Sequence, residues 1–411
     1  MSAIKVDDYN VAVIGGGAAG LVCAVTCAKK DKNRKVIIIE KEQRVGKKIL
    51  ATGNGRCNLT NMNASPENYH GSFQKGVENL LKEIPPSEVL NFFEDIGLFW
   101  KEEDEGRVYP YSNQASSVLD VLRLALDRLG VEEKCGCIVK SVSKRGNKFS
   151  VVCDGCTVTA EKVVVCTGGK ASEKLGSDGS GLKFLKEMGH TITPLYPSLV
   201  PVSVKNPYMK SLKGIRCMGE VSLADEKGKI IKKEHGEIQF GEKALSGICV
   251  FNLSSYVGEI KKPRIYINLF PEYDFNTLVD LLFKRRKMLS ENTLEDFFTG
   301  MLHKRIGFVI LKDVLSKNLS QKVGILTKAD IKQIAQTLTK WEFDCTVNMS
   351  FSSAQVTKGE VSGKEIDPYT MESKKVKGLY ICGEAADVDG DCGGYNLQFA
   401  FSSGIMAGRM V

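Results

Sequence analysis

Two glycine-rich segments, one near each end of the 411-residue chain, contain the residue types that bind nucleotide phosphates. In the first, Gly15, Gly17 and Gly20 fit G-x-G-x-x-G directly after the apolar run 11–14. The first glycine permits a tight turn, the second lets backbone approach a pyrophosphate, and the third lets a helix pack on the strand. We expect a helix over 18–30 whose first N–H groups and positive dipole end face phosphates.

A second strand and an acid complete this first unit. Residues 36–39 are apolar and end at Glu40, which lies 20 residues after Gly20. A carboxylate at this spacing accepts hydrogen bonds from ribose hydroxyl groups. Because strand, helix, strand and acid occur in order, the pattern favours a dinucleotide-binding unit over a chance glycine-rich turn.

The C-terminal segment 383–398 follows an apolar strand over 378–382 and opens a last helix after Gly394. Carboxylates at Glu384 and Asp387 would accept hydrogen bonds from the ribityl chain of a flavin nucleotide. Bare N–H groups at the helix start would face the flavin pyrimidine and stabilise its reduced anion. We therefore predict one tightly bound FAD, held by both ends of the chain.

A polar loop over 46–61 is too long to be a mere connector. A reduced flavin is negatively charged near N1 and O2, so it favours donors and cations nearby. Lys47, Lys48, Arg56 and Asn58 would supply them, or would bind an acidic substrate. The loop has one cysteine, Cys57, so the paired-thiol chemistry of flavin disulfide reductases is disfavoured.

A third turn, Thr167-Gly168-Gly169, ends the apolar strand predicted over 162–166, at the edge of the sheet where ligands collect. Lys48, Arg56 and Tyr111 are the candidates to bind or polarise a substrate. The predicted cofactor-binding residues are Gly15, Gly16, Gly17, Ala18, Ala19, Gly20, Glu40, Lys41, Lys47, Lys48, Gly53, Asn54, Arg56, Cys57, Asn58, Val139, Thr167, Gly168, Gly169, Gly383, Glu384, Asp387, Gly394, Asn396, Leu397 and Gln398.

The predicted fold is α/β, with a discontinuous FAD-binding Rossmann-like domain over 1–192 and 348–411. Short strand signals after a run of prolines predict a β-barrel-like substrate domain over 193–271 and 338–347. Between its parts we expect a small helical insert over 272–337, with helices at 277–290, 294–302 and 328–337.

Thirteen cysteines, an odd number, argue against a disulfide framework. Cys135, Cys137, Cys153 and Cys156 have spacings that allow a zinc site. However, Asp154-Gly155 is a strong hairpin turn signal, so two small apolar residues flanking a turn are the simpler interpretation. We predict no metal.

The net charge of +8, from 57 Lys and Arg against 49 Asp and Glu, is modest for this length. The densest basic cluster, 284–287, lacks the interleaved aromatic residues of single-strand binders, so we expect no nucleic-acid partner. There is no apolar run of about 18 residues and no signal-peptide core at the start, which predicts a cytoplasmic protein without a membrane partner. The oligomeric state stays open.

Segments 15–20, 52–61 and 388–398 together resemble the BaiN/YhiN-like flavoproteins, also called the aminoacetone-oxidase family of FAD-binding enzymes. Segments 108–112, 166–169 and 354–359 support the resemblance, which covers essentially the whole chain. It implies an FAD domain of the two-dinucleotide-binding type, with a barrel-like insert and a helical sub-insert. One departure is Gly359-Glu360-Val361, where many relatives have Gly-Gly-Val, and we expect it to alter a wall of the active site.

The resemblance implies an FAD-dependent oxidoreductase that transfers hydride between flavin N5 and a small organic substrate. Relatives are assigned both amine oxidation and reduction of double bonds in steroid-like acids, so both reactions stay open. No second dinucleotide fingerprint follows a strand, so NAD(P)H would bind only transiently as electron donor. The alternatives are a tRNA-modifying flavoprotein and a non-catalytic flavin-binding protein.

Overall fold

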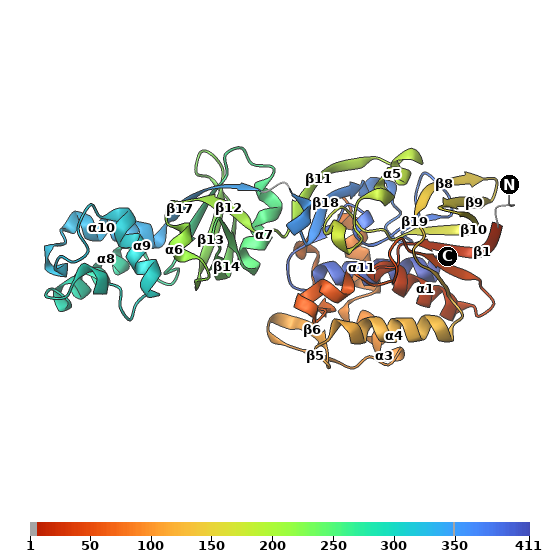
Figure 1. Ribbon diagram of the computed structural model, residues 1–411, viewed down its shortest axis with the longest axis horizontal. Helices are drawn as coiled ribbons and strands as arrows, with labels where there is room; N and C mark the ends of the chain where they lie inside the picture. The colour runs from red at the N-terminus through yellow and green to blue at the C-terminus, as the bar shows by residue number, and fades with distance from the viewer. Residues whose placement is uncertain (1–5, 348–349) are drawn as a thin grey trace. The chain divides into compact units, whose positions relative to one another are not determined.

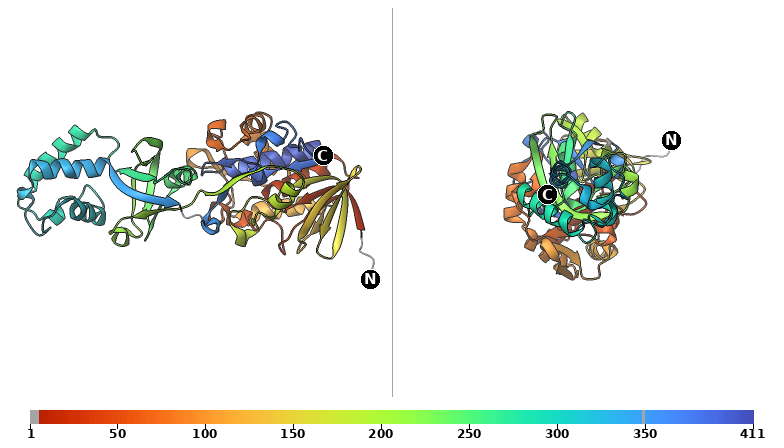
Figure 2. Two further views of the ribbon diagram at one scale, coloured as in Figure 1. Left: turned by 90° about the horizontal axis from the view of Figure 1, so that it is seen from above. Right: turned by 90° about the vertical axis from the view of Figure 1, so that its left-hand side faces the viewer.

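The computed structural model describes residues 6–347 and 350–411. The chain forms two compact units (Figures 1 and 2). One contains residues 1–198 and 350–411, and the other, the inserted unit, contains Leu199–Met349. The first unit therefore combines the two ends of the chain, as the two glycine-rich segments predict.

A seven-stranded sheet forms the centre of the first unit, in the order β7-β2-β1-β10-β9-β8 with β19 paired to β10. Strands β7, β2, β1, β10 and β19 are all parallel to one another. The carboxyl ends of these strands thus meet at one edge, where ligands of such sheets bind. The bounds are β1 Val6–Ile14, β2 Val36–Ile39, β7 Glu132–Lys134, β8 Val139–Arg145, β9 Lys148–Cys153, β10 Cys156–Val165 and β19 Leu379–Ile381.

Helices from the two ends of the chain lie side by side on this sheet. Helix α1 (Ala18–Lys30) packs on α11 (Tyr395–Met410) closely enough that a Cβ at Gly404 would lie 2.3 Å from the carbonyl oxygen of Ala19. Glycine on α11 therefore permits the close approach. The other helices of this unit are α2 Gln74–Glu83, α3 Pro86–Asp95, α4 Ala115–Arg128 and α5 Ser180–Glu187.

Three small sheets surround the carboxyl edge and join segments far apart in the sequence. They pair β3 with β6 and β5, β4 with β20, and β11 with β18. Their bounds are β3 Thr60–Asn61, β4 Tyr69–His70, β5 Trp100–Glu102, β6 Arg107–Pro110, β11 Ile192–Ser198, β18 Val356–Val361 and β20 Asp389–Gly390.

The inserted unit is a closed barrel, β12-β15-β14-β13-β16-β17, with helices attached. Barrel and helices share one hydrophobic cluster that includes Trp341 and Phe343 of the barrel and Phe297 of the helical segment. The bounds are β12 Val202–Lys205, α6 Met209–Leu212, β13 Arg216–Ala224, β14 Ile230–Phe240, β15 Ala244–Ser246, α7 Ile248–Val257, β16 Arg264–Asn268, α8 Phe275–Met288, α9 Lys304–Val314, α10 Lys328–Thr339 and β17 Trp341–Val347. The Rossmann-like fold with a barrel-like insert is confirmed, whereas the predicted three-domain boundaries stay a prediction.

The helix predicted over 294–302 is wrong. This segment has a single 3-10 turn, Leu294–Asp296, and the next helix, α9, begins only at Lys304. Leu294, Phe297 and Phe298 are buried at helical spacing, which explains the prediction. Gly300 adopts φ +75°, a left-handed conformation that ends a helix. Among the described helices, none is long and apolar enough to cross a membrane.

Candidate cofactor and active site

The glycines of the β1–α1 turn differ in backbone conformation and in the space around them. Gly15 adopts φ +100°, and a Cβ at Gly20 would lie 2.0 Å from the Gly15 carbonyl oxygen, so neither position accepts a side chain. In contrast, no heavy atom lies within 4 Å of a Cβ built on Gly17, the N-cap of α1. No side chain caps α1 here, so the first N–H groups of the helix have no partner within it. Free space in front of these N–H groups is what a bound phosphate requires.

Glu40, at the end of β2, lies against this turn. Its carboxylate accepts hydrogen bonds from the backbone N–H of Gly16 at 2.7 Å and of Glu42 at 2.8 Å. The neighbouring cations are paired with surface carboxylates: Lys47 with Glu42 at 2.8 Å, and Lys41 with an aspartate, Asp178, at 2.6 Å. The predicted ribose-binding acid is therefore next to the glycine turn, while the two lysines form ion pairs at the surface.

The structure brings together Lys48 and Glu384, which are 336 residues apart in the sequence. The Lys48 Nζ lies 2.8 Å from Glu384 Oε2, and it also donates to the Ala171 carbonyl at 3.3 Å. Glu384 Oε1 accepts the backbone N–H of Thr357 at 2.8 Å. The turn at Gly168 is adjacent, since a Cβ there would lie 3.8 Å from Glu384 Oε2. Three predicted cofactor segments thus converge at the sheet edge.

Arg56 is fixed by three residues outside its loop. Its guanidinium lies 3.9 Å from the centre of the Tyr109 ring and donates to Glu103 and Asn113. Gly53 and Asn54, which precede it, both adopt left-handed conformations. By contrast, the side chain of Tyr111 is 69% exposed, and the structure does not bring it into these contacts.

Cys57 is fully buried, and burial raises the pKa of its thiol to about 12. The thiol is therefore protonated at neutral pH, which agrees with the absence of a predicted redox role. Asn58 follows it in the loop, and its Oδ1 lies 3.0 Å from a Cβ built on Gly394, at the start of α11. The loop thus reaches the start of the last helix.

Several predicted side chains stabilise the start of α11. Gln398 is fully buried and bonds Thr60 at 2.5 Å and the Ile84 carbonyl at 3.1 Å. Asn396 exchanges hydrogen bonds with the Gly390 backbone. Asp387 accepts a hydrogen bond from the Ser72 hydroxyl at 2.6 Å. Two further predicted residues, Leu397 and Val139, are half-buried and pack against the main hydrophobic core.

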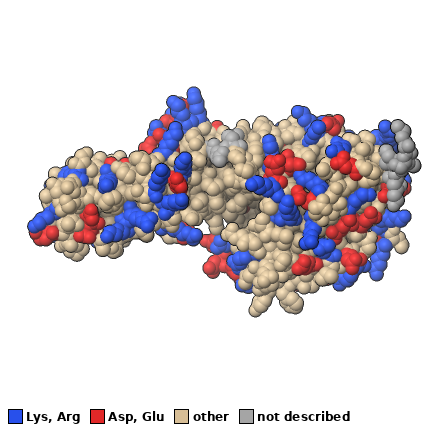
Figure 3. Space-filling view, viewed as in Figure 1, with Lys and Arg blue, Asp and Glu red and all other residues tan. Residues whose placement is uncertain are grey.

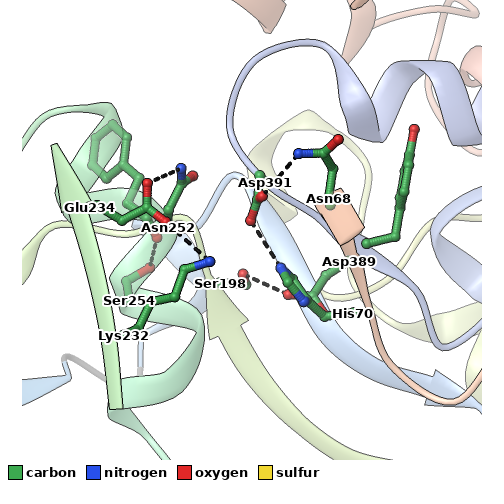
Figure 4. Close-up of polar contacts among 12 residues, drawn as sticks. Asn68, His70, Ser198, Lys232, Glu234, Asn252, Ser254, Asp389 and Asp391 are labelled. Carbon is green, nitrogen blue, oxygen red and sulfur yellow. Dashed lines mark hydrogen bonds and ion pairs between the residues drawn. The ribbon is translucent and has the colours of Figure 1, made fainter. Parts of the chain in front are cut away.

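Sequence reasoning missed a cluster of acids around His70 on β4 (Figure 4). The Nε2 of His70 lies 2.9 Å from Asp391 Oδ1, and Asp389 pairs with His70 across the β4–β20 ladder. Asp389 accepts the Ser198 hydroxyl at 3.1 Å, and burial raises the pKa of its carboxyl to about 6. The available signal was the alternation of carboxylates at 387, 389 and 391.

Glu360 on β18 is the second missed residue. It is fully buried, its φ is +119°, and both of its carboxylate oxygens are unpartnered within the described chain. Burial raises its pKa far above the usual range, and the nearby carboxylate of Glu384 adds to this shift. A Cβ at Gly169 would lie 2.6 Å from its Oε1. A buried carboxyl group with a strongly raised pKa thus forms part of this region.

The unpartnered atoms show that a polar ligand fits this region. Asn58 Oδ1, Asp389 Oδ1 and both oxygens of Glu360 are buried without hydrogen-bond partners in residues 6–347 and 350–411. Buried polar groups in folded proteins are nearly always paired, so these oxygens are suited to a bound molecule or ordered water. These oxygens can accept hydrogen bonds from the hydroxyl and N–H groups of FAD, and the open helix start at Gly17 offers N–H groups to its phosphates. When bound, FAD supplies hydride transfer at its ring.

Comparison with known proteins agrees with this geometry. The family model described as the HI0933-like protein Rossmann domain matches residues 9–410. The chain belongs to this family. The 3-dehydro-bile acid delta(4,6)-reductase of Clostridium scindens is 35% identical over 404 residues, which cover 97% of this chain and 98% of the reductase. The ribosomal RNA dihydrouridine synthase of Escherichia coli is 29% identical over 397 residues, 96% of each chain.

Solved structures show the same fold at low identity. The 3-ketosteroid delta1-dehydrogenase of Sterolibacterium denitrificans has a TM-score of 0.51 at 12% identity, covering 98% of this chain and 99% of the dehydrogenase. A quinol-fumarate reductase also has a TM-score of 0.51 at 14% identity, covering 99% of this chain and 71% of the reductase. The predicted resemblance is confirmed: the chain is an enzyme of an FAD-dependent oxidoreductase family.

Proposed function

We propose that this enzyme reduces a carbon–carbon double bond conjugated to a carbonyl group in a small organic acid. The observation that carries the proposal is the 35% identity with the bile acid reductase over nearly the full length of both chains. The name of that relative describes a 3-oxo compound with double bonds at positions 4 and 6. NAD(P)H is proposed as the transient electron donor.

The proposed FAD site follows from the converging segments. The turn from Gly15 to Gly20 and the start of α1 would hold the diphosphate, with Glu40 at the ribose. The start of α11 at Gly394 would lie at the ring. The remaining predicted contacts, including Lys48, Asn58, the Thr167-Gly168-Gly169 turn and Glu384, surround these points and are proposed with them.

Saturation of a double bond needs a proton as well as a hydride, and we place the proton source at His70. Asp391 lies 2.9 Å from its Nε2, so the carboxylate fixes the orientation of the ring. Asp389, with a pKa near 6, lies beside it as a second proton-holding group. Lys48 is already neutralised by Glu384, which makes it a positioning group, while Arg56 and Tyr111 stay candidates to bind an acidic substrate.

Anaerobic flavin spectra test this proposal. We expect NADH or NADPH to bleach absorbance near ~450 nm, and a conjugated 3-oxo steroid acid to restore it while its mass rises by about 2 Da. His70→Gln should slow the second step and leave the first unchanged, whereas His235→Gln, in the barrel, should change neither. Bleaching by amines, with oxygen uptake and no reduction of the conjugated acid, would instead establish amine oxidation.

A second candidate is reduction of uridine in RNA, which is also saturation of a double bond conjugated to a carbonyl. One observation favours it: Leu199–Met349 has 24 Lys and Arg against 17 Asp and Glu, so this inserted unit carries +7 of the chain's +8. Lys and Arg side chains lie on several parts of its visible face (Figure 3). The expectation that no nucleic acid binds thus stays a prediction.

Salt-dependent binding distinguishes the two candidates. An RNA substrate predicts that ribosomal RNA fragments bind with an affinity that falls steeply with salt. It also predicts dihydrouridine in RNA incubated with the enzyme and NADPH. A small-acid substrate predicts neither result.

A further inference from the structure

Three cysteines that the proposed function does not use meet at one end of the main sheet. The sulfur atoms of Cys137, Cys153 and Cys156 all lie within 4.8 Å of one another. All three are free thiols. Cys137 and Cys153 are buried, and Cys156 is half-buried, so the cluster has an inner part and an accessible side.

The fold places these thiols by three separate local constraints. Cys153 and Cys156 are directly opposite across the β9–β10 hairpin, whose two-residue turn is closed by Gly155 at φ +79°. The Cys153 position also pairs with Val139 of β8, so the chain just before β8 runs beside the hairpin. There the backbone N–H of Cys137 is fixed by the Glu40 carbonyl at 2.9 Å. The cluster is therefore held by backbone pairing and does not depend on a flexible loop.

The electrostatic setting suits thiolates that share a cation. Lys134, on β7, lies close enough to Cys156 and Cys137 for their thiols to raise the pKa of its amino group, and it also forms an ion pair with Asp7 at 3.8 Å. Three thiolates with a divalent ion have a net charge of −1, and one ammonium group neutralises it.

The distances match a soft metal after a small contraction. Zinc–sulfur bonds are about 2.3 Å, so tetrahedral geometry places two sulfurs about 3.8 Å apart. The present separations are at most 4.8 Å, so the sulfurs would need to approach one another by no more than about 1 Å. An ordinary turn flanked by two cysteines has no third thiol nearby, whereas here Cys137 supplies one from outside the hairpin.

We propose that Cys137, Cys153 and Cys156 bind one zinc ion through three thiolates, with a fourth position open towards the accessible side. The site clamps the β9–β10 hairpin to the chain before β8. The proposal departs from the sequence-based prediction of no metal. The cluster contains both cysteines of C-x-x-C and one cysteine of C-x-C, and Cys135 lies outside it.

Metal analysis of the FAD-loaded enzyme, purified without oxygen or chelator, tests the proposal. We expect about one zinc per chain, released when a mercurial titrates the thiols. Cys153→Ser should lower zinc affinity at least about tenfold and leave the FAD content unchanged. Cys217→Ser is the matched control, because Cys217 is a partly buried strand cysteine in the barrel, and it should keep the zinc.

Cobalt substitution gives a second readout that does not depend on yield. The sulfur-to-cobalt charge-transfer band should be that of three thiolates in the wild type and of two in Cys153→Ser. Equal, substoichiometric metal in the wild type and both variants would overturn the proposal. So would a 153–156 disulfide, detected by mass, in enzyme purified without oxygen.

Discussion

Replacing Glu360 by glycine is expected to stabilise the flavin-free protein. The residue has φ +119°, and strained positive-φ conformations of non-glycine residues cost about 1–3 kcal/mol. Its buried carboxyl lacks a partner within the described residues, and such a group costs about 1–3 kcal/mol. Against this, the variant loses two buried methylenes, about 0.8 kcal/mol each, and gains unfolded-state entropy worth about 0.5–1 kcal/mol. The net expectation is a stabilisation of about 1–2 kcal/mol.

Scanning calorimetry of flavin-free protein measures this change, and the midpoint should rise by about 1–3 °C for a protein of this size. Glu360→Gln is the matched control, because it keeps the strained backbone and the shape but cannot ionise. The folded-state pKa of Glu360 is raised, so its cost is small below the unfolded pKa and grows as pH rises above it. Glu360→Gln should therefore gain more at pH 8 than at pH 4.5, while the strain relieved in Glu360→Gly is independent of pH.

A lower midpoint for Glu360→Gly in flavin-free protein would refute this reasoning, since it would mean that the carboxyl has a favourable partner. Equal flavin affinity in the wild type and Glu360→Gln would show that the acid does not contact the cofactor. A lower flavin affinity in both Glu360 variants than in the wild type would show that the unpartnered oxygens bind the flavin.

Three further outcomes follow from the site and its neighbours. Glu365→Gln should cost about 1–2 kcal/mol of stability at pH 7. Burial raises the pKa of Glu365, but hydrogen bonds from Lys375 and Thr191 outweigh it and lower this pKa to about 2. The urea midpoints of variant and wild type should therefore converge as pH falls from 4.5 to 2. Burial raises the pKa of the Asp389 carboxyl from 3.8 to about 6, so its ionisation destabilises the fold. Asp389→Asn should therefore gain stability relative to the wild type as pH rises from 3.8 to 6 and keep that gain at higher pH; equal pH profiles in calorimetry would contradict this. Gly20→Ala should prevent flavin uptake, measured by the 280-to-450 nm absorbance ratio, because its Cβ would lie 2.0 Å from the preceding turn.

The cofactor-binding half of the fold was predictable because its determinants are local. The apolar run at 11–14, the glycine spacing and the acid at Glu40 occur within 30 residues, and the strand and helix lie where this pattern indicates. The hairpin at Asp154-Gly155 was predictable for the same reason, since two turn residues fix the pairing of their flanking strands. By contrast, the apolar spacing at 294–298 predicted a helix where the chain forms only a 3-10 turn, Leu294–Asp296, followed by a left-handed Gly300.

The sequence by itself determined the family of this chain and the glycine turns and helix starts at its two ends, because the signals for phosphate binding are local. Only the tertiary structure decided which side chains meet there. The Lys48–Glu384 pair and the ladder that joins His70 to Asp389 each bridge more than 300 residues. The unpartnered oxygens of Glu360 and the meeting of three cysteines depend likewise on strand pairing, which no local spacing reveals.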